Sequence, residues 1–192
     1  MAKQQKPATR AIRIQTTKTS QKEHSSPVFL TSSFTYDSAE DMAAAFATET
    51  PEVNIYSRFA NPGVDEFVNK MISLEGAEHG VATGTGMAAI FSTFMTFLSK
   101  GDHIISASAV FGSTHTILTK YLPKWGVDYS YFDMNRPETI EALVKPSTKM
   151  LYLETPSNPG LDIIDIEFVA AICKKYNILF VVDNCFATPA VQ

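Results

Sequence analysis

The chain has 192 residues, of which 45% are hydrophobic and 19% are charged, a composition typical of a folded globular protein and not of a disordered one. No apolar run approaches the ~20 residues that cross a bilayer, and residues 1–30 contain no compact apolar signal segment, so we expect neither a membrane protein nor a secreted one. Two cysteines, Cys173 and Cys185, are too few for a disulfide framework, which favours a cytoplasmic location.

The first residues are basic, whereas the rest of the chain is acidic. The net charge at pH 7 is −4, yet residues 1–22 carry no acid beside six basic side chains: Lys3, Lys6, Arg10, Arg13, Lys18 and Lys22. A nucleic-acid-binding arm and a transit peptide are two interpretations, but the stretch has neither a basic cluster nor a clear amphipathic pattern. We therefore expect a plain N-terminal arm, solvated or lying on a neighbouring subunit, and no nucleic-acid or membrane partner.

The N-terminal third has no regular alternation of elements. In chain order we expect an extended Ser/Thr-rich segment at 24–36, a helix at about 38–48, a loop at 49–63 and a helix at about 64–75. Asp37 or Ser38 would begin the first helix and Gly76 would end the second. We divide the chain into an arm and loop, residues 1–60, and the first part of a larger domain, residues 61–192.

From about residue 77, apolar runs alternate with helical patterns. Strands are expected at 79–83, 102–107, 127–132, 149–154 and 178–183. Helices are expected between them at about 86–99, 113–122, 137–144 and 165–176. This alternation predicts an α/β fold with a mostly parallel sheet covered by helices on both faces. The continuous apolar runs 150–153 and 178–182 are typical of strands buried on both faces.

Two segments contain residues suited to binding a phosphate. The run 83–87 (TGTGM) leaves a strand and opens a helix, where glycines and free N–H groups accommodate an anion, although a turn without a ligand is equally compatible. Its spacing matches neither a dinucleotide fingerprint nor a Walker loop. In the loop 54–62, Tyr56 and Arg58 would point to the same side if the backbone is extended and could grip a phosphate together. The alternative is a surface arginine packed on an aromatic ring.

Three more candidates follow predicted strands at the same edge of the sheet. Asp183 closes the run 178–182, where a carboxylate needs a cationic partner. Asn158 lies in the segment 154–160, whose two X-Pro bonds allow a cis peptide, and its amide could bind a ligand oxygen or form a turn. Phe111 could stack on a flat ring or fill the core.

Taken together, these groups fit a ligand that has a phosphate, a flat ring and a protonated ring nitrogen. Pyridoxal 5′-phosphate is such a molecule, and an acid beside its pyridine nitrogen keeps that nitrogen protonated, which makes the ring an electron sink. No metal site is expected. A nucleotide-binding α/β domain remains an alternative, which selective binding of pyridoxal phosphate over nucleotides would exclude.

The sequence resembles the pyridoxal-phosphate enzymes of cysteine and methionine metabolism, a family with the type I (aspartate aminotransferase-like) transferase fold. The matching segments, in family order, are 56–62 (YSRFANP), 84–90 (GTGMAAI), 154–159 (ETPSNP) and 182–189 (VDNCFATP). The family includes cystathionine gamma-synthase, cystathionine lyases, methionine gamma-lyase and O-acylhomoserine sulfhydrylases.

The resemblance implies a role for each candidate residue. Gly86 and Met87 would bind the cofactor phosphate through backbone N–H groups, Asn158 the ring hydroxyl and Asp183 the pyridine nitrogen. Tyr56 and Arg58 would reach the phosphate in a neighbouring subunit, so a homo-oligomer, usually a dimer of dimers, is implied.

Two departures from the family pattern lie in the segment 111–114, and a third concerns the Schiff-base lysine. Phe111 stands where many members have a tyrosine, so stacking is kept but acid–base chemistry is not. Ser113 replaces the cysteine typical of methionine gamma-lyases, and the variant 111–114 (FGST) looks more like the O-succinylhomoserine sulfhydrylase branch.

The family's Schiff-base lysine follows the aspartate by roughly two dozen residues, whereas the last lysine here is Lys175. We therefore expect the lysine beyond Gln192, the C-terminal domain absent and this chain alone inactive. The expected whole enzyme performs γ-replacement in methionine biosynthesis. The alternatives are γ-elimination and a non-catalytic subunit that donates Tyr56 and Arg58 to a partner's site.

Overall fold

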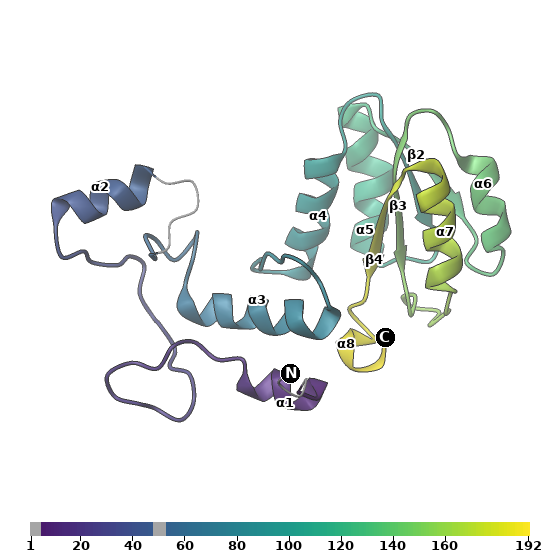
Figure 1. The fold of residues 1–192 in the computed structure, drawn as a ribbon. Helices are drawn as coiled ribbons and strands as arrows, with labels where there is room; N and C mark the ends of the chain where they lie inside the picture. Colours follow the sequence, from purple (N-terminus) through teal and green to yellow (C-terminus); the bar gives the residue numbers. More distant parts are fainter. Residues whose placement is uncertain (1–4, 48–52) are drawn as a thin grey trace. The chain divides into compact units, whose positions relative to one another are not determined.

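The computed structural model describes residues 5–47 and 53–192. The chain divides into two compact units, Met1–Ala82 and Thr83–Gln192, so the predicted arm lies inside the first unit (Figure 1). Within the described residues, no helix is long and apolar enough to cross a membrane.

The second unit contains a sheet of four parallel strands. Their order across the sheet is β2-β1-β3-β4, with β1 at His103–Ala107, β2 at Asp128–Phe132, β3 at Thr148–Glu154 and β4 at Leu179–Asp183. The predicted parallel sheet is therefore confirmed, and four of the five predicted strands form close to their expected positions.

The predicted strand at 79–83 does not form. Val81 is 91% exposed, and residues 79–81 lie beside the helix of the first unit that spans Pro62–Glu75. A β-strand requires backbone pairing with a neighbour. None of the four strands in the described part of the chain pairs with this segment. The apolar run at 79–83 was therefore not sufficient by itself to form a strand.

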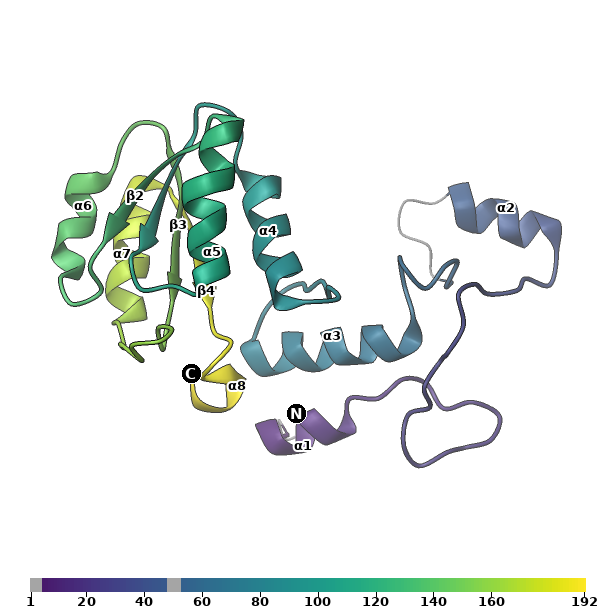
Figure 2. The ribbon, with the colours of Figure 1, turned by 180° about the vertical axis from the view of Figure 1, so that it is seen from behind.

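Helices cover both faces of the sheet. They are α4 (Gly86–Phe97), α5 (Gly112–Thr116), α6 (Ile140–Leu143) and α7 (Ile166–Tyr176). A short helix that was not predicted, α8 (Thr188–Val191), follows the end of β4. The chain continues from α5 through a π-helical turn at Ile117–Tyr121 and a 3₁₀ turn at Leu122–Trp125. α5 lies over one face and α7 over the other, as the two opposite views show (Figures 1 and 2). The chain moves in one direction from β1 to β2, and in the opposite direction from β2 past β1 to β3 and on to β4. Because crossovers between parallel strands are right-handed, the two directions place their connecting helices on opposite faces of the sheet.

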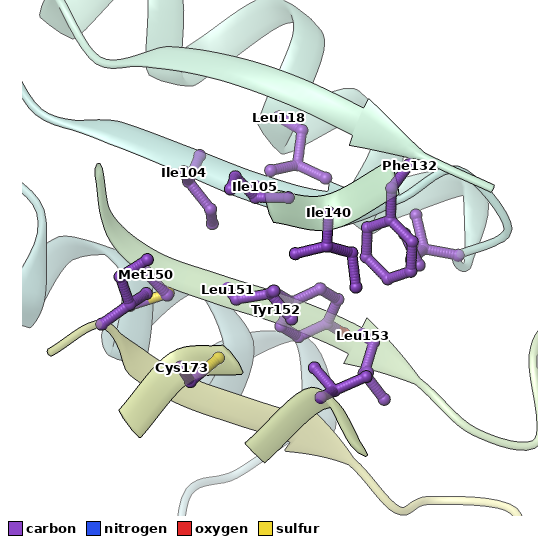
Figure 3. Close-up of a cluster of buried hydrophobic side chains, with 14 of the residues drawn as sticks. Ile104, Ile105, Leu118, Phe132, Ile140, Met150, Leu151, Tyr152, Leu153 and Cys173 are labelled. Atoms are coloured by element: carbon purple, nitrogen blue, oxygen red, sulfur yellow. The ribbon is translucent and has the colours of Figure 1, made fainter. Parts of the chain in front are cut away.

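The core of this unit is built around β3. Side chains 150–154 of β3 are all buried, and they meet residues of β1, α6 and α7 such as Ile105, Ile140 and Cys173 (Figure 3). β4 differs from the prediction, because its residues are half-buried or exposed and Leu179 is 39% exposed. It is the outermost strand of the described sheet, so its backbone pairs on one side only.

His103 ties three strands together at the amino ends of the sheet. The side chain is fully buried, with Nδ1 2.8 Å from the Thr148 hydroxyl oxygen on β3 and Nε2 2.9 Å from the Ser130 hydroxyl oxygen on β2. Burial lowers the pKa of His103, and the Lys145 ammonium lowers it further, whereas Asp128 acts in the opposite direction. The folded chain therefore favours the neutral imidazole.

The described residues of the first unit form three helices, and α2 and α3 have clear end signals. They are α1 (Pro7–Arg13), which was not predicted, α2 (Ala39–Ala47) and α3 (Pro62–Glu75). The Ser38 hydroxyl accepts the Asp41 N–H at 3.0 Å at the start of α2, as expected. The Asn61 side chain accepts the Gly63 N–H at the start of α3, and Gly76 ends α3 in the left-handed conformation at φ 66°.

The basic N-terminal segment packs on the chain's own α3. The Arg10 guanidinium donates to the Ser73 hydroxyl at 2.9 Å and to the Ser73 carbonyl. Glu66 of α3 accepts the Thr16 N–H at 2.8 Å and pairs with Lys70 at 2.6 Å. These bonds lower the pKa of Glu66 to about 2, with the Lys70 bond the largest cause. This part of the arm is therefore not simply solvated.

We expect stability to fall in acid because of His103. Its pKa is lower in the folded state than the ordinary ~6.5 of the unfolded chain, so its contribution is present above that pH and is lost as pH falls below it. His103→Gln should reduce the difference in free energy of unfolding between about pH 7.5 and about pH 5.5. Urea unfolding at both pH values measures this difference in free energy of unfolding.

His115→Gln, at an exposed position on α5, is the control and should keep the difference found in the unchanged chain. An equal pH dependence of the free energy of unfolding in His103→Gln and in the unchanged chain would contradict the assignment.

Candidate functional site

The candidate site lies at the carboxyl ends of the parallel strands. β1, β3 and β4 end at Ala107, Glu154 and Asp183, and because they run in one direction their ends meet at one edge of the sheet. The chain leaves β1 toward β2 on one side and returns to β3 on the other, which makes the gap between β1 and β3 a topological switch point. In open α/β sheets, ligands bind outside the strand ends at such a point.

A pocket of about 250 Å³ opens between α4 and the end of β4. It is lined by residues of α4 from Gly86 to Phe94, by Tyr152 of β3 and by residues 181–185. The volume is below the ~300–1,000 Å³ of sites for drug-sized ligands, so it suits a molecule with a single ring. Two predicted site residues, Gly86 and Asp183, therefore line one pocket.

The start of α4 presents free backbone donors. Thr85 caps the helix, because its hydroxyl accepts the Ala88 N–H at 3.0 Å and its carbonyl accepts from Ala88 and Ala89. The N–H groups of Gly86 and Met87 donate to no acceptor in the part of the chain that the structure describes. Two free donors and the helix dipole favour an anion here. The Met87 side chain packs on the core, so only its backbone is available.

Asp183 is held by hydrogen bonds to both of its oxygens. The Tyr152 phenol donates to Oδ2 at 3.2 Å, and the Cys185 N–H donates to Oδ1 at 2.9 Å. Burial raises the pKa of Tyr152, and the carboxylates of Asp183 and Glu154 raise it further, so the phenol keeps its proton. A half-buried carboxylate with two fixed donors can accept a further bond from a cationic N–H.

A second carboxylate, Glu154, fixes the loop that carries Phe111. Glu154 is 4% exposed, pairs in register with Asp183, and accepts the Phe111 N–H at 2.7 Å. Burial raises the pKa of Glu154 and Asp183 acts in the same direction, whereas the Phe111 bond opposes them. Glu154 therefore anchors the start of α5 to the end of β3.

Phe111 and Asn158 lie at the same edge of the sheet but do not line the pocket. Phe111 is 44% exposed, so it is not core filler. Asn158 is half-buried in the turn after β3, and the Thr155–Pro156 and Asn158–Pro159 bonds are both cis, as the sequence allowed. Their predicted roles toward a ligand stay predictions.

Tyr56 and Arg58 belong to the first unit, where their loop forms a turn. The N–H groups of Phe59 and Ala60 both donate to the Tyr56 carbonyl, so the backbone here is a turn. The extended backbone that would place the side chains of Tyr56 and Arg58 on the same side does not form. The Arg58 guanidinium still lies 5.3 Å from the ring centres of Tyr56 and Phe59. This is the packed arrangement that the sequence left as the alternative.

Sequence reasoning missed the parts played by Tyr152, Glu154 and Thr85. A buried tyrosine usually finds a partner for its hydroxyl, which was a usable signal for Tyr152 in an otherwise apolar strand. The contacts of Tyr152 and Glu154 depend on the pairing of β3 with β4, which the sequence does not specify. Thr85 precedes a helix start and fits the cap preference.

Residues 8–192 match the family described as Cys/Met metabolism PLP-dependent enzyme. The chain belongs to this family. It is 42% identical over 184 residues to an O-succinylhomoserine sulfhydrylase of Pseudomonas aeruginosa, covering 96% of this chain and 45% of that protein. It is 39% identical over 167 residues to an L-methionine gamma-lyase of Fusobacterium nucleatum, covering 86% of this chain and 42% of the other. The chain thus spans less than half the length of these relatives.

Solved structures agree with the family assignment. A putative O-acetylhomoserine (thiol)-lyase of Campylobacter jejuni, solved with a pyridoxyl-lysine phosphate group, matches with a TM-score of 0.90 and 29% identity over 97% of this chain and 46% of that one. A cystathionine gamma-lyase of Lactobacillus plantarum matches with a TM-score of 0.83 and 30% identity over 96% of this chain and 46% of that one. The fold is therefore that of these enzymes, and the family's cofactor is pyridoxal phosphate.

The residues of the pocket fit this cofactor. The free N–H of Gly86, which lines the pocket, and that of Met87, the next residue of α4, suit a phosphate, and the carboxylate of Asp183 suits a protonated ring nitrogen. Space is also available at the helix start, because a methyl group added at Gly86 would meet no atom within 4 Å.

We expect Gly86→Pro to weaken binding of pyridoxal phosphate roughly tenfold to a hundredfold, because a hydrogen bond to a charged group contributes ~1.5–3 kcal/mol. Proline removes the free N–H but suits the first position of a helix, and Thr85, at φ −153° and ψ 155°, suits the residue before a proline. Calorimetric titration measures the binding, and urea unfolding should show a change below ~0.5 kcal/mol.

Pyridoxal without its phosphate is the control ligand for this variant. Its affinity should not change, because the lost N–H serves the phosphate alone. An equal loss for both ligands would mean that the proline ring obstructs the pocket, and would contradict the assignment.

Proposed function

We propose that the whole protein is a pyridoxal-phosphate enzyme of γ-replacement. Its substrate is an O-acylhomoserine, with the O-succinyl ester favoured, and sulfide or cysteine replaces the acyl group at the γ-carbon. The observation that carries the proposal is a pocket lined both by Gly86, whose backbone N–H is free, and by Asp183, whose carboxylate accepts two hydrogen bonds. The 42% identity to an O-succinylhomoserine sulfhydrylase supports the choice of ester.

Each residue of the site has a proposed task. Gly86 and Met87 bind the phosphate through their N–H groups, and Asp183 holds the proton on the ring nitrogen. Asn158 contacts the ring hydroxyl and Phe111 covers the ring face. When bound, pyridoxal phosphate supplies an electron-withdrawing ring that stabilises a neighbouring carbanion.

Phe111 bears on which residue moves the proton. Phe111 has no ionisable group, so it orients a ring but moves no proton. Proton transfer at the substrate must then fall to another residue, and we propose the lysine that carries the cofactor. None of the described residues that line the pocket is a lysine.

Tyr56 and Arg58 are proposed to complete the phosphate site of a second subunit. Arg58 is exposed and stacks on two aromatic rings, which leaves its fork of N–H donors available to an anion. The active assembly is then a homo-oligomer, and we propose a dimer of dimers.

Elimination is the second candidate reaction. L-methionine gamma-lyases from several bacteria are 36–39% identical to this chain, and both reactions begin with activation of the same substrate carbon skeleton. Ser113, in place of the cysteine of many gamma-lyases, favours replacement. Assays with O-succinylhomoserine and with methionine as substrates distinguish the two.

We expect the 192-residue chain to release no succinate from O-succinylhomoserine in the presence of sulfide, because none of the described residues that line the pocket is a lysine. A version extended through the family's lysine should release it. Chromatographic measurement of succinate and homocysteine tests both. Turnover by the 192-residue chain would contradict the assignment of the proton-moving lysine.

A mixing experiment tests whether the chain is instead a non-catalytic subunit. A full-length relative that lacks its counterpart of Arg58 is mixed with this chain, and the γ-replacement rate is measured. The favoured proposal assigns this donation to assemblies of whole subunits and therefore expects no recovery from the 192-residue chain alone. Recovery that disappears with the Arg58→Ala version of this chain would support donation of Tyr56 and Arg58 to a partner.

A further inference from the structure

We propose that Tyr152 is the positioning residue that sets Asp183 toward a protonated ring nitrogen. The inference rests on the proposed function. Tyr152 lies in the middle of β3 with 1% of its surface exposed, yet its phenol reaches the pocket lining and donates to Asp183 Oδ2 at 3.2 Å.

Strand pairing explains why this tyrosine meets this carboxylate. Tyr152 pairs with Val181, so Asp183, two residues further along β4, is its diagonal neighbour on the same face of the sheet. A diagonal separation is within reach of a long side chain such as tyrosine. The contact therefore follows from the parallel register of β3 and β4.

The phenol supplies one of two donors that fix the carboxylate. The other is the Cys185 N–H, which donates to Oδ1 at 2.9 Å. With one donor at each oxygen, the carboxylate plane is set, and each oxygen keeps acceptor capacity for a ligand. Loss of the phenol would free one oxygen and allow the group to turn.

The ring of Tyr152 also connects Asp183 to the phosphate-binding helix. It packs edge-to-face on Phe94, with ring centres 5.2 Å apart and planes at 84°. Phe94 is fully buried on α4, the helix that begins at Gly86. Tyr152 therefore touches both elements that line the pocket.

The protonation state of Tyr152 suits this task. Burial and the nearby carboxylates of Asp183 and Glu154 raise the pKa of Tyr152, so the phenol remains a donor. A donor to the charged carboxylate favours its charged form, and a charged carboxylate favours a protonated ring nitrogen. The hydroxyl thus acts on the ligand through Asp183 without touching it.

The test compares Tyr152→Phe with the unchanged 192-residue chain. The variant keeps the ring that packs on Phe94 and removes only the hydroxyl. Without ligand, nuclear magnetic resonance should show a changed chemical shift of the Asp183 carboxyl carbon in the variant, because the hydroxyl that donates to Oδ2 is lost. Tyr131→Phe is the matched control, because Tyr131 bonds to His115 outside the pocket, and it should leave that chemical shift unchanged.

A pair of ligands separates positioning from a structural role. Tyr152→Phe should weaken binding of pyridoxal 5′-phosphate roughly fivefold to tenfold, but not binding of its 1-deaza analogue, which has carbon in place of the ring nitrogen. An equal loss for both ligands, or an unchanged chemical shift of the Asp183 carboxyl carbon, overturns the assignment. If the unchanged chain binds neither ligand while this chemical shift still differs in the variant, the proposed function fails and the hydrogen bond between Tyr152 and Asp183 stands.

Discussion

The parallel pairing of β3 with β1 and β4 is the constraint on which the rest of the site depends. Because the three strands run in one direction, the residues that end them meet at one edge, and the register places Glu154 beside Asp183. Two carboxylates in a poorly solvated position repel each other and lose hydration, which is costly unless donors compensate. The Phe111 N–H, the Cys185 N–H and the Tyr152 hydroxyl are those donors. The loops after β1 and β4 therefore take their positions from these bonds as well as from packing.

The two ends of the sheet carry different kinds of polar group. At the amino ends, His103 is fully enclosed and both ring nitrogens have a hydroxyl partner, so this group serves the fold alone. At the carboxyl ends, Asp183 is half-buried beside a pocket and keeps acceptor capacity. The proposed ligand site and the buried histidine thus lie at opposite ends of the same strands, an arrangement common in α/β folds because loops at one end can vary while the sheet is kept.

Much of the fold was predictable, because buried strands and capped helices leave local signals. The apolar run 150–153 marks a buried strand, Asp183 marks the end of a strand, and Gly86 marks the start of a helix. The strand at 79–83 was wrong because an apolar run does not supply a pairing partner, and α1 and α8 were missed because short helices show little periodicity. The loop at Tyr56 is a turn, because two N–H groups bond back to the Tyr56 carbonyl, and it has the packed arginine that the sequence offered as the alternative. The contacts of Tyr152 and Glu154 required the register across strands, which a single sequence does not contain.

The place of Asp183 on the outermost described strand has a consequence for motion. In the 192-residue chain this strand pairs on one side, and such a strand opens locally at lower free energy than one paired on both sides, so the backbone amides of β4 should exchange with solvent faster than those of β3. An opening of β4 would break the hydrogen bond between Tyr152 and Asp183. A ligand bound to Asp183 would then favour the closed strand and slow amide exchange along β4 in this chain.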